Sequence, residues 1–218
     1  MRKGYGLFII EEINKKKQGD PIFTEAVADL VVKEFGIDIR RAKGIVNTNL
    51  NRLNGNLILN YKKGVYYKPK ITVFGKAPLN PMKIATEMYL KNNDKIIGYE
   101  TGASLLQQIG LTTQISRYRY IATNRYHQRG KRVIEDMKLV ISKPNTEVTK
   151  DNCLYLQFTD AIENKDGIII DAHNPNEILN EYIIKNQLDY GKLVAIATKN
   201  YSKEVLLRIA DLAVKTRL

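Results

Sequence analysis

The chain has 218 residues, a hydrophobic fraction of 44%, a single cysteine and a formal net charge of +12. The length predicts one or two domains, and the hydrophobic fraction suffices for at least one sizeable core. No apolar run approaches the roughly 18 residues of a membrane span, and Glu11 and Glu12 end the first apolar stretch too early for a signal peptide. One cysteine excludes an intramolecular disulfide and a multi-cysteine zinc site. We therefore expect a soluble, cytoplasmic protein.

The excess positive charge is concentrated in two segments. Residues 1–70 hold 14 basic and 7 acidic residues, and residues 117–143 hold 8 and 2. Residues 144–218 are slightly acidic, with 9 basic and 11 acidic residues. This concentration favours a polyanionic partner, because a merely solvated surface mixes its signs. Charge alone does not separate DNA from RNA or from an acidic protein.

The first basic segment begins with a pattern of three helices. Apolar residues recur at helical spacing over residues 5–18, from Thr24 to Gly36 and again from Asp38. We expect Thr24 and Asp38 to act as N-cap residues and Gly36 to end the second helix. Because so few residues separate the second helix from the third, the pattern is typical of a helix-turn-helix.

A hairpin is predicted after the third helix. Residues 57–61 and 65–68 are rich in β-branched and aromatic residues and flank a turn that contains Lys62, Lys63 and Gly64. Tyr66 and Tyr67 alternate, so one is expected in the core and the other is free to reach a phosphate. Three helices closed by a lysine-tipped hairpin predict a winged helix-turn-helix over residues 1–70.

The third helix is strongly two-faced. Its core face is expected to comprise Ile39, Ala42, Val46, Leu50 and Leu53. The opposite face contains no acid and no large apolar residue; it comprises Arg40, Arg41, Gly44, Asn47, Thr48, Asn51 and Arg52. Arginine pairs with guanine edges and asparagine with adenine edges in the major groove. A solvated helix face is the plainer alternative, but the lack of Asp and Glu favours contact with DNA.

These observations define the candidate DNA-binding residues. The third helix would enter the major groove and the hairpin would touch the neighbouring backbone. The set is Arg40, Arg41, Lys43, Asn47, Thr48, Asn51, Arg52, Lys62 and Lys63.

A linker and a second domain follow. Three prolines within residues 69–81 indicate a linker over residues 71–80, with a short extended piece at residues 71–74. Asn80 and Pro81 then predict a helix start. We expect residues 81–218 to form a mixed α/β domain with a helical tail, which makes the whole chain an α+β protein.

The second basic segment predicts strands over residues 116–123 and 132–141, joined by a basic loop or hairpin connection. A sheet with one solvated face is one interpretation, and a second patch that contacts phosphates is the other. The candidate residues of this patch are Arg117, Arg119, Arg125, Arg129, Lys131 and Arg132.

Catalytic and metal chemistry is not indicated. Gly98 and Gly102 lack the Lys and Ser/Thr of a phosphate loop, and Cys153 has no histidine near it in sequence. Asp171, His173 and Glu177 have mixed spacing, and the chain has only two histidines. We therefore expect a protein that is not an enzyme and needs no metal or cofactor, with a tail that packs or binds protein.

Two stretches resemble the AbiEi-like antitoxins of type IV (abortive-infection) toxin–antitoxin systems. Residues 64–69 (GVYYKP) are similar to that family's wing strand, and residues 98–114 (GYETGASLLQQIGLTTQ) to its second signature, with Thr101 where Ser is commoner. Residues 119–124 (RYIATN) continue the similarity. It covers roughly residues 24–142, and the order of wing, linker and signature also agrees.

The resemblance implies a role in phage defence. It implies an N-terminal domain that binds inverted repeats of double-stranded operator DNA at its own promoter and represses transcription. It also implies a C-terminal antitoxin domain that counteracts a co-encoded nucleotidyltransferase-like toxin without requiring a stable complex. Two alternatives remain: a stand-alone winged-helix regulator, and a protein of another class in which the winged helix is an interaction module.

Overall fold

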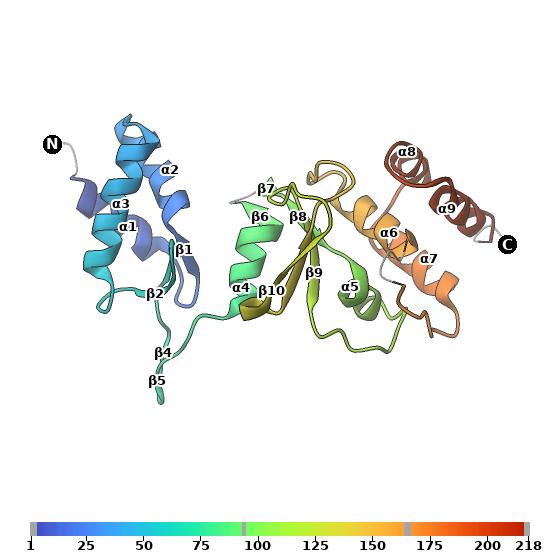
Figure 1. The fold of residues 1–218 in the computed structure, drawn as a ribbon, viewed down its shortest axis with the longest axis horizontal. Coiled ribbons are helices and arrows are strands. Elements are labelled where there is room, and N and C mark those ends of the chain that lie inside the picture. The colour runs from blue at the N-terminus through green and yellow to red at the C-terminus, as the bar shows by residue number, and fades with distance from the viewer. Residues whose placement is uncertain (1–3, 93–94, 164–166, 216–218) are drawn as a thin grey trace. The chain divides into compact units, whose positions relative to one another are not determined.

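The computed structural model describes residues 4–92, 95–163 and 167–215. The chain divides into two compact units, Met1–Ile84 and Ala85–Leu218 (Figure 1). The protein is of the α+β type. Helices lie near its N-terminus, and both helices and strands follow along the chain. No helix within the described ranges is long and apolar enough to cross a membrane.

The first unit consists of helices packed on a small sheet, followed by a separate hairpin. The helices are α1 (Tyr5–Lys15), α2 (Thr24–Phe35) and α3 (Ile39–Leu53). Strands β1 (Pro21–Phe23), β2 (Leu59–Lys62) and β3 (Val65–Tyr67) form an antiparallel sheet of order β1-β3-β2. The hairpin comprises β4 (Ile71–Thr72) and β5 (Gly75–Lys76).

Helix boundaries in this unit follow local chemistry, with one exception. The Asp38 carboxylate accepts hydrogen bonds from the backbone N–H groups of Arg40 and Arg41, as an N-cap residue should. Gly36 ends α2 in the left-handed conformation, at φ 66°. The prediction that Thr24 caps α2 is wrong: Phe23 occupies the N-cap position and the buried Thr24 hydroxyl has no hydrogen-bond partner among the described residues.

The core of the first unit confirms the amphipathic pattern of α3. Ala42, Val46 and Leu50 are each 0% exposed and pack with residues of α1 and α2. Ile39 departs from the prediction at 43% exposed, because it is the first residue of the helix and lies at the edge of this packing. The alternation expected of Tyr66 and Tyr67 is also wrong, since both are buried in β3, the central strand of the sheet.

The second unit begins with a short, irregular helical segment. The helix α4 (Pro81–Ala85) spans the boundary between the units and continues as a π-helix over Thr86–Leu90. Asn80 caps its start by accepting a hydrogen bond from the N–H of Met82. Within this segment Ala85 is buried, whereas Met82 is 41% exposed.

The main sheet of the second unit has the order β10-β11-β9-β8. These strands are β8 (Gly98–Glu100), β9 (Arg119–Thr123), β10 (Lys131–Ile134) and β11 (Leu139–Ser142). A shorter pair, β6 (Lys91–Asn92) and β7 (Lys95–Ile96), precedes it. The single strand expected over residues 132–141 is wrong: the 3₁₀ turn Glu135–Met137 divides it into β10 and β11. Consequently β10 pairs with β11, and β9 pairs in parallel with β11.

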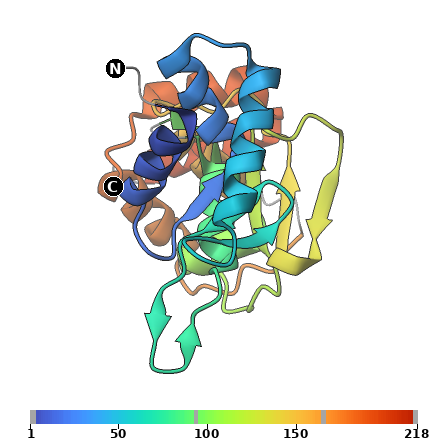
Figure 2. The same cartoon turned by 90° about the vertical axis from the view of Figure 1, so that its left-hand side faces the viewer.

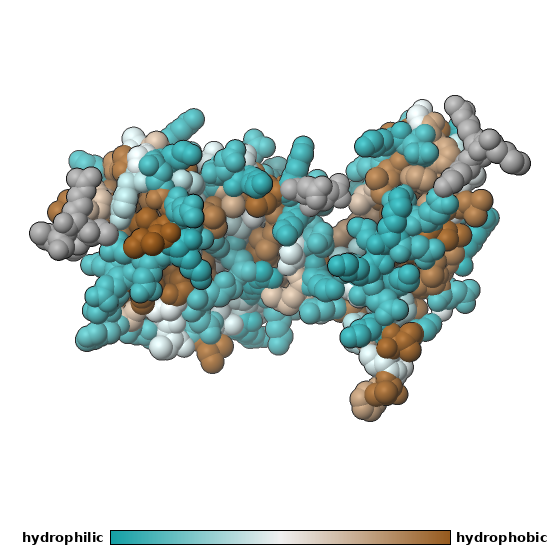
Figure 3. Space-filling view, turned by 180° about the vertical axis from the view of Figure 1, so that it is seen from behind, coloured by the Kyte–Doolittle hydropathy of each residue, from teal (hydrophilic) through white to brown (hydrophobic). Residues whose placement is uncertain are grey.

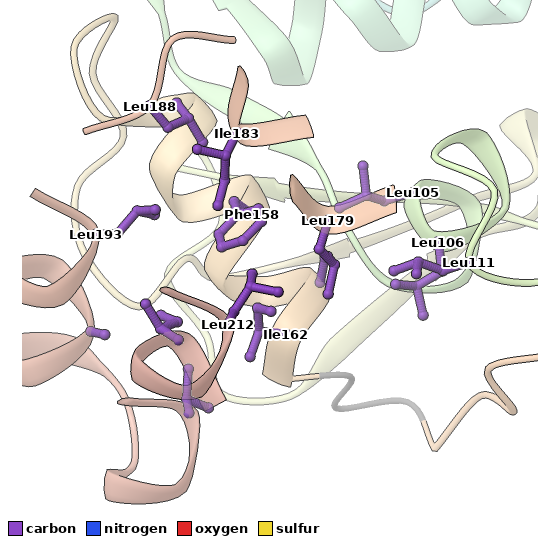
Figure 4. Packing of buried hydrophobic residues seen from close by; sticks show 14 residues of the cluster. Leu105, Leu106, Leu111, Phe158, Ile162, Leu179, Ile183, Leu188, Leu193 and Leu212 are labelled. Atoms are coloured by element: carbon purple, nitrogen blue, oxygen red, sulfur yellow. The ribbon is translucent and has the colours of Figure 1, made fainter. Parts of the chain in front are cut away.

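Helices complete the unit: α5 (Gly102–Gln108), α6 (Cys153–Glu163), α7 (Pro175–Lys185), α8 (Tyr190–Asn200) and α9 (Lys203–Lys215). Their buried side chains form a common core around Phe158, which is 1% exposed (Figure 4). Leu105, Leu106 and Leu111 of the region around α5 belong to the same core. The helical tail predicted from the sequence is therefore a packed part of this unit.

A half-buried carboxylate connects the sheet to the tail. Asp160 of α6 accepts hydrogen bonds from the hydroxyls of Tyr99, Thr101 and Tyr201. Burial raises the pKa of Tyr99 and of Tyr201 well above the ordinary tyrosine value, so both hydroxyls stay protonated and can donate. This network is structural, since it joins β8, α6 and the residue that follows α8.

Candidate nucleic-acid interface

The polar face of α3 is exposed to solvent. We call the exposed residues of this face the recognition strip. They are Arg40, Arg41, Gly44, Asn47, Thr48, Asn51 and Arg52. No described residue forms an ion pair or hydrogen bond with the side chains of Arg40, Arg41 or Arg52. The buried apolar face on the opposite side of α3 fixes the direction in which the strip points.

Two members of the recognition strip have partners within the unit. The Asn51 Oδ1 atom accepts a 2.6 Å hydrogen bond from the hydroxyl of Tyr66. The Thr48 hydroxyl donates to the carbonyl oxygen of Gly44 at 3.0 Å. Asn47, by contrast, forms no side-chain hydrogen bond with a described residue, so its amide is available for a ligand. Asn47 is therefore the better candidate for reading a base edge, and Asn51 is partly committed to the fold.

The fold does not require the absence of a side chain at Gly44. A Cβ atom built there meets nothing within 4 Å. Glycine in a helix interior nevertheless costs about 1 kcal/mol relative to alanine. An exposed glycine in the middle of an otherwise polar strip is consistent with a ligand that approaches the backbone closely.

The remaining predicted DNA-contact residues of the first unit are, with one exception, less exposed than the recognition strip. Lys43 pairs with Glu25 at 3.1 Å and its side chain is 45% exposed. Lys62 is half-buried, with its Nζ atom 6.0 Å from the centroid of the Tyr61 ring. Only Lys63, at the turn between β2 and β3, is exposed. The adjacent Gly64 carbonyl accepts a hydrogen bond from the N–H of Thr24, so this turn is tied closely to the start of α2.

The recognition strip lies within a longer stretch of sequence without acidic residues, which the sequence reasoning missed. Between Asp38 and Glu87 the sequence contains no acidic residue, whereas it contains ten lysines and arginines. The region covers α3, the sheet strands β2 and β3, and the β4–β5 hairpin. A simple count of charges along the chain would have found it.

The second predicted patch is only partly exposed. Arg117, Arg125, Arg129, Lys131 and Arg132 are exposed. Arg125 and Arg132 both lie near Tyr89, where their charges oppose the burial that raises the pKa of that tyrosine. Arg117 lies over the Tyr118 ring at 5.3 Å, and the Lys131 Nζ atom lies 5.6 Å from the centroid of the Tyr120 ring.

Arg119 does not join that patch. Its side chain is 17% exposed and pairs with Glu100, which also accepts a hydrogen bond from Gln108. The strand predicted over residues 116–123 is shorter in the structure, because β9 begins at Arg119 and Arg117 precedes it. Arg119 therefore stabilises the junction of β8, β9 and α5.

Two of the residues considered for catalysis or metal binding are buried or form hydrogen bonds within the fold. Cys153 is 8% exposed, and burial raises the pKa of its thiol. Asp171 accepts hydrogen bonds from the N–H and the hydroxyl of Thr113, which lower the pKa of its carboxyl. No group of His, Cys, Asp and Glu in the described part of the chain is arranged to hold a metal ion.

The longer of the two stretches that carry the family resemblance, residues 98–114, contributes to the core of the second unit. Leu105, Leu106 and Leu111 lie in its main core, and Thr113 binds Asp171. A Cβ atom at Gly98 would lie 2.1 Å from the carbonyl oxygen of Tyr89 and 2.7 Å from that of Ala122. The buried residues of the stretch 98–114 therefore meet packing requirements of the fold, whereas Gln107, Gln108 and Gln114 are exposed. Comparison of the chain with protein-family models finds no match, and neither does comparison with curated proteins.

Proposed function

We propose that the first unit is a winged helix-turn-helix that binds duplex DNA through the recognition strip. The order of its elements, α1-β1-α2-α3-β2-β3, and the short turn between α2 and α3 support this assignment. The observation that carries the proposal is the exposed, acid-free recognition strip. Its arginines and Asn47 have the chemistry that reads base edges and holds phosphates.

We further propose that the chain represses its own promoter and acts as the antitoxin to a co-encoded nucleotidyltransferase-like toxin. The support is the similarity of residues 64–69 and 98–114 to AbiEi-like antitoxins, together with the DNA-binding chemistry of the first unit. Expression of the neighbouring gene with and without this chain tests the antitoxin role. Growth arrest that the chain relieves is the expected result, and arrest that the chain leaves unchanged would contradict it.

Binding to DNA is tested by fluorescence anisotropy with labelled duplexes of about 30 base pairs across a series of salt concentrations. We expect the logarithm of affinity to fall linearly with the logarithm of salt. Arg52→Ala or Lys63→Ala should reduce the slope by about one for each lost phosphate contact. Lys33→Ala, at an exposed position on α2, is the matched control. An unchanged slope in both test variants would remove these residues from the interface.

Asn47→Ala should relax sequence preference at one base pair, at a cost of about 1–3 kcal/mol on the preferred duplex and little change on random DNA. Competition between a duplex selected from a random pool and random duplexes measures both quantities. Asn51→Ala is a weaker test, because it also leaves the buried Tyr66 hydroxyl without its partner. Equal losses on selected and random DNA would exclude a base-reading role for Asn47.

Gly44→Ala should have opposite effects on stability and on DNA affinity. The free energy of unfolding should rise by up to about 1 kcal/mol, because alanine favours the helix and its Cβ meets nothing within 4 Å. Affinity for duplex DNA should fall, because the added methyl group separates the backbone from the ligand. Denaturant unfolding and anisotropy on the same preparation measure the two effects. A more stable variant with unchanged affinity would place Gly44 outside the interface.

A further inference from the structure

The β4–β5 hairpin carries two fully exposed apolar side chains at its tip. Val73 is 95% exposed and Phe74 is 98% exposed. Both views of the ribbon show the hairpin extending away from the helices of the first unit (Figures 1 and 2). In the space-filling view the tip is brown below a predominantly teal surface (Figure 3). Two adjacent apolar side chains that extend this far into water are a candidate contact for a partner.

The tip has a defined conformation. Ile71 pairs with Lys76 and Thr72 with Gly75, which leaves Val73 and Phe74 as the turn. The Thr72 hydroxyl donates to the Gly75 carbonyl at 2.9 Å and accepts from the N–H of Phe74 at 3.3 Å. Gly75 has φ 99°, a conformation that L side chains rarely adopt. The two apolar side chains are thus presented by a pre-formed turn.

The surroundings of the hairpin are basic. Lys70 and Lys76 flank it, and both it and α3 lie in the acid-free region between Asp38 and Glu87. The Nζ atom of Lys76 donates a 3.0 Å hydrogen bond to the Gly55 carbonyl, in the turn that follows α3. The base of the hairpin is therefore attached next to the end of the helix that carries the recognition strip.

We propose that the hairpin enters the minor groove and that Val73 and Phe74 wedge between two stacked base pairs. This inference rests on the proposed binding of DNA by the first unit. Apolar wedges between base steps are a common device of minor-groove proteins. Three residues of strand from Lys70 to Val73 span about 10 Å, which exceeds the roughly 7.5 Å depth of a minor groove. Lys70 and Lys76 can then face the two phosphate backbones.

DNA fits the tip better than a lipid surface or a second copy of the chain. Binding to a membrane interface scales with buried apolar area, and two side chains on a narrow turn offer little of it. A contact between two copies would bring the lysines of two equally basic hairpins together. A base step needs only one or two inserted side chains, and its phosphates match the flanking lysines.

The test uses the full chain bound to duplexes selected from a random pool. Permanganate oxidises unstacked thymines, and pyrimidine–purine steps such as TA unstack most easily. We expect a permanganate-reactive step beside the bases protected by the wild-type protein. The double variant V73S/F74S should lose this reactivity, keep the same hydroxyl-radical footprint and lose no more than about tenfold in affinity. The control I184S alters an apolar side chain of α7 that is 71% exposed and should behave as wild type.

The outcomes separate this inference from the proposed function. A footprint without any reactive step, or reactivity that V73S/F74S retains, overturns the wedge and leaves DNA binding intact. Absence of any footprint overturns DNA binding and the wedge together. Two further measurements use the protein without DNA. One is co-sedimentation with phosphatidylserine vesicles, and the other is the molar mass of the protein in solution. If the wild-type protein binds vesicles and V73S/F74S does not, the tip contacts a membrane instead. If the wild-type protein is a dimer and V73S/F74S is not, the tip contacts a second copy of the chain.

Discussion

Replacing Arg40, Arg41 and Arg52 together by alanine should reduce the affinity of the chain for duplex DNA by roughly 100-fold or more. These three arginines supply the positive charge of the recognition strip, and no described side chain competes for them. Because all three are exposed and alanine is the best helix former, the variant should fold normally. Anisotropy titrations with selected and random duplexes measure the loss, and circular dichroism checks the fold.

A triple variant with the same change in charge is the control for that experiment. Lys33, Lys199 and Lys203 are exposed and lie on α2, α8 and α9, outside the recognition strip and the second patch. Their replacement by alanine removes three positive charges, so it reports the effect of net charge alone. If both triple variants lose the same affinity, binding depends on overall charge and the account of α3 is wrong.

Gly98→Ala should destabilise the second unit severely, by about 3 kcal/mol or more. The new Cβ would lie 2.1 Å from the Tyr89 carbonyl oxygen and 2.7 Å from the Ala122 carbonyl oxygen. Both are backbone atoms, so neither can rotate away, and the pairing of β8 with β9 must open. Thermal or denaturant unfolding of the full chain measures the loss.

Gly44→Ala is the matched comparison, because it adds the same methyl group where nothing lies within 4 Å. We expect one glycine substitution to stabilise the first unit and the other to disrupt the second. Amide signals of α1–α3 should survive in Gly98→Ala, since those helices belong to a separate compact unit. A Gly98→Ala protein as stable as wild type would contradict the close approach of the three backbone segments.

Short-range patterns in the sequence predicted the first unit well. The spacing of Ala42, Val46 and Leu50 repeats every four residues, so it places all three on one side of α3. Capping by Asp38 and termination at Gly36 are equally local. The strand β1 was missed because its three residues are too short to show alternation. Its pairing with β3 covers that strand, which explains why Tyr66 and Tyr67 are both buried.

The second unit depends on contacts that a sequence pattern does not contain. The parallel pairing of β9 with β11 joins residues that alternation alone cannot assign to one another. The 3₁₀ turn at Glu135–Met137 and the left-handed Lys138, at φ 47°, interrupt a run of residues that resembles one strand. Arg119 illustrates the consequence for site prediction, since only the fold reveals that Glu100 binds it.

The candidate interface was predictable to the extent that it lies on one helix. Exposure of the recognition strip follows from helical periodicity, but the hydrogen bond from Tyr66 to Asn51 and the pair between Lys43 and Glu25 are tertiary. The hairpin with its apolar tip was expected only as an extended piece of linker. Its β-strands have two residues each, below the length at which a pattern can be recognised.

The contact between α3 and DNA can be observed directly by titrating the isotopically labelled full chain with a duplex selected from a random pool and following the backbone amide signals. We expect the largest shifts within Ile39–Leu53, with smaller ones at Lys63 and at the β4–β5 hairpin. Shifts confined to the basic loop between β9 and β10, or to α6–α9, with α3 unaffected, would contradict the account.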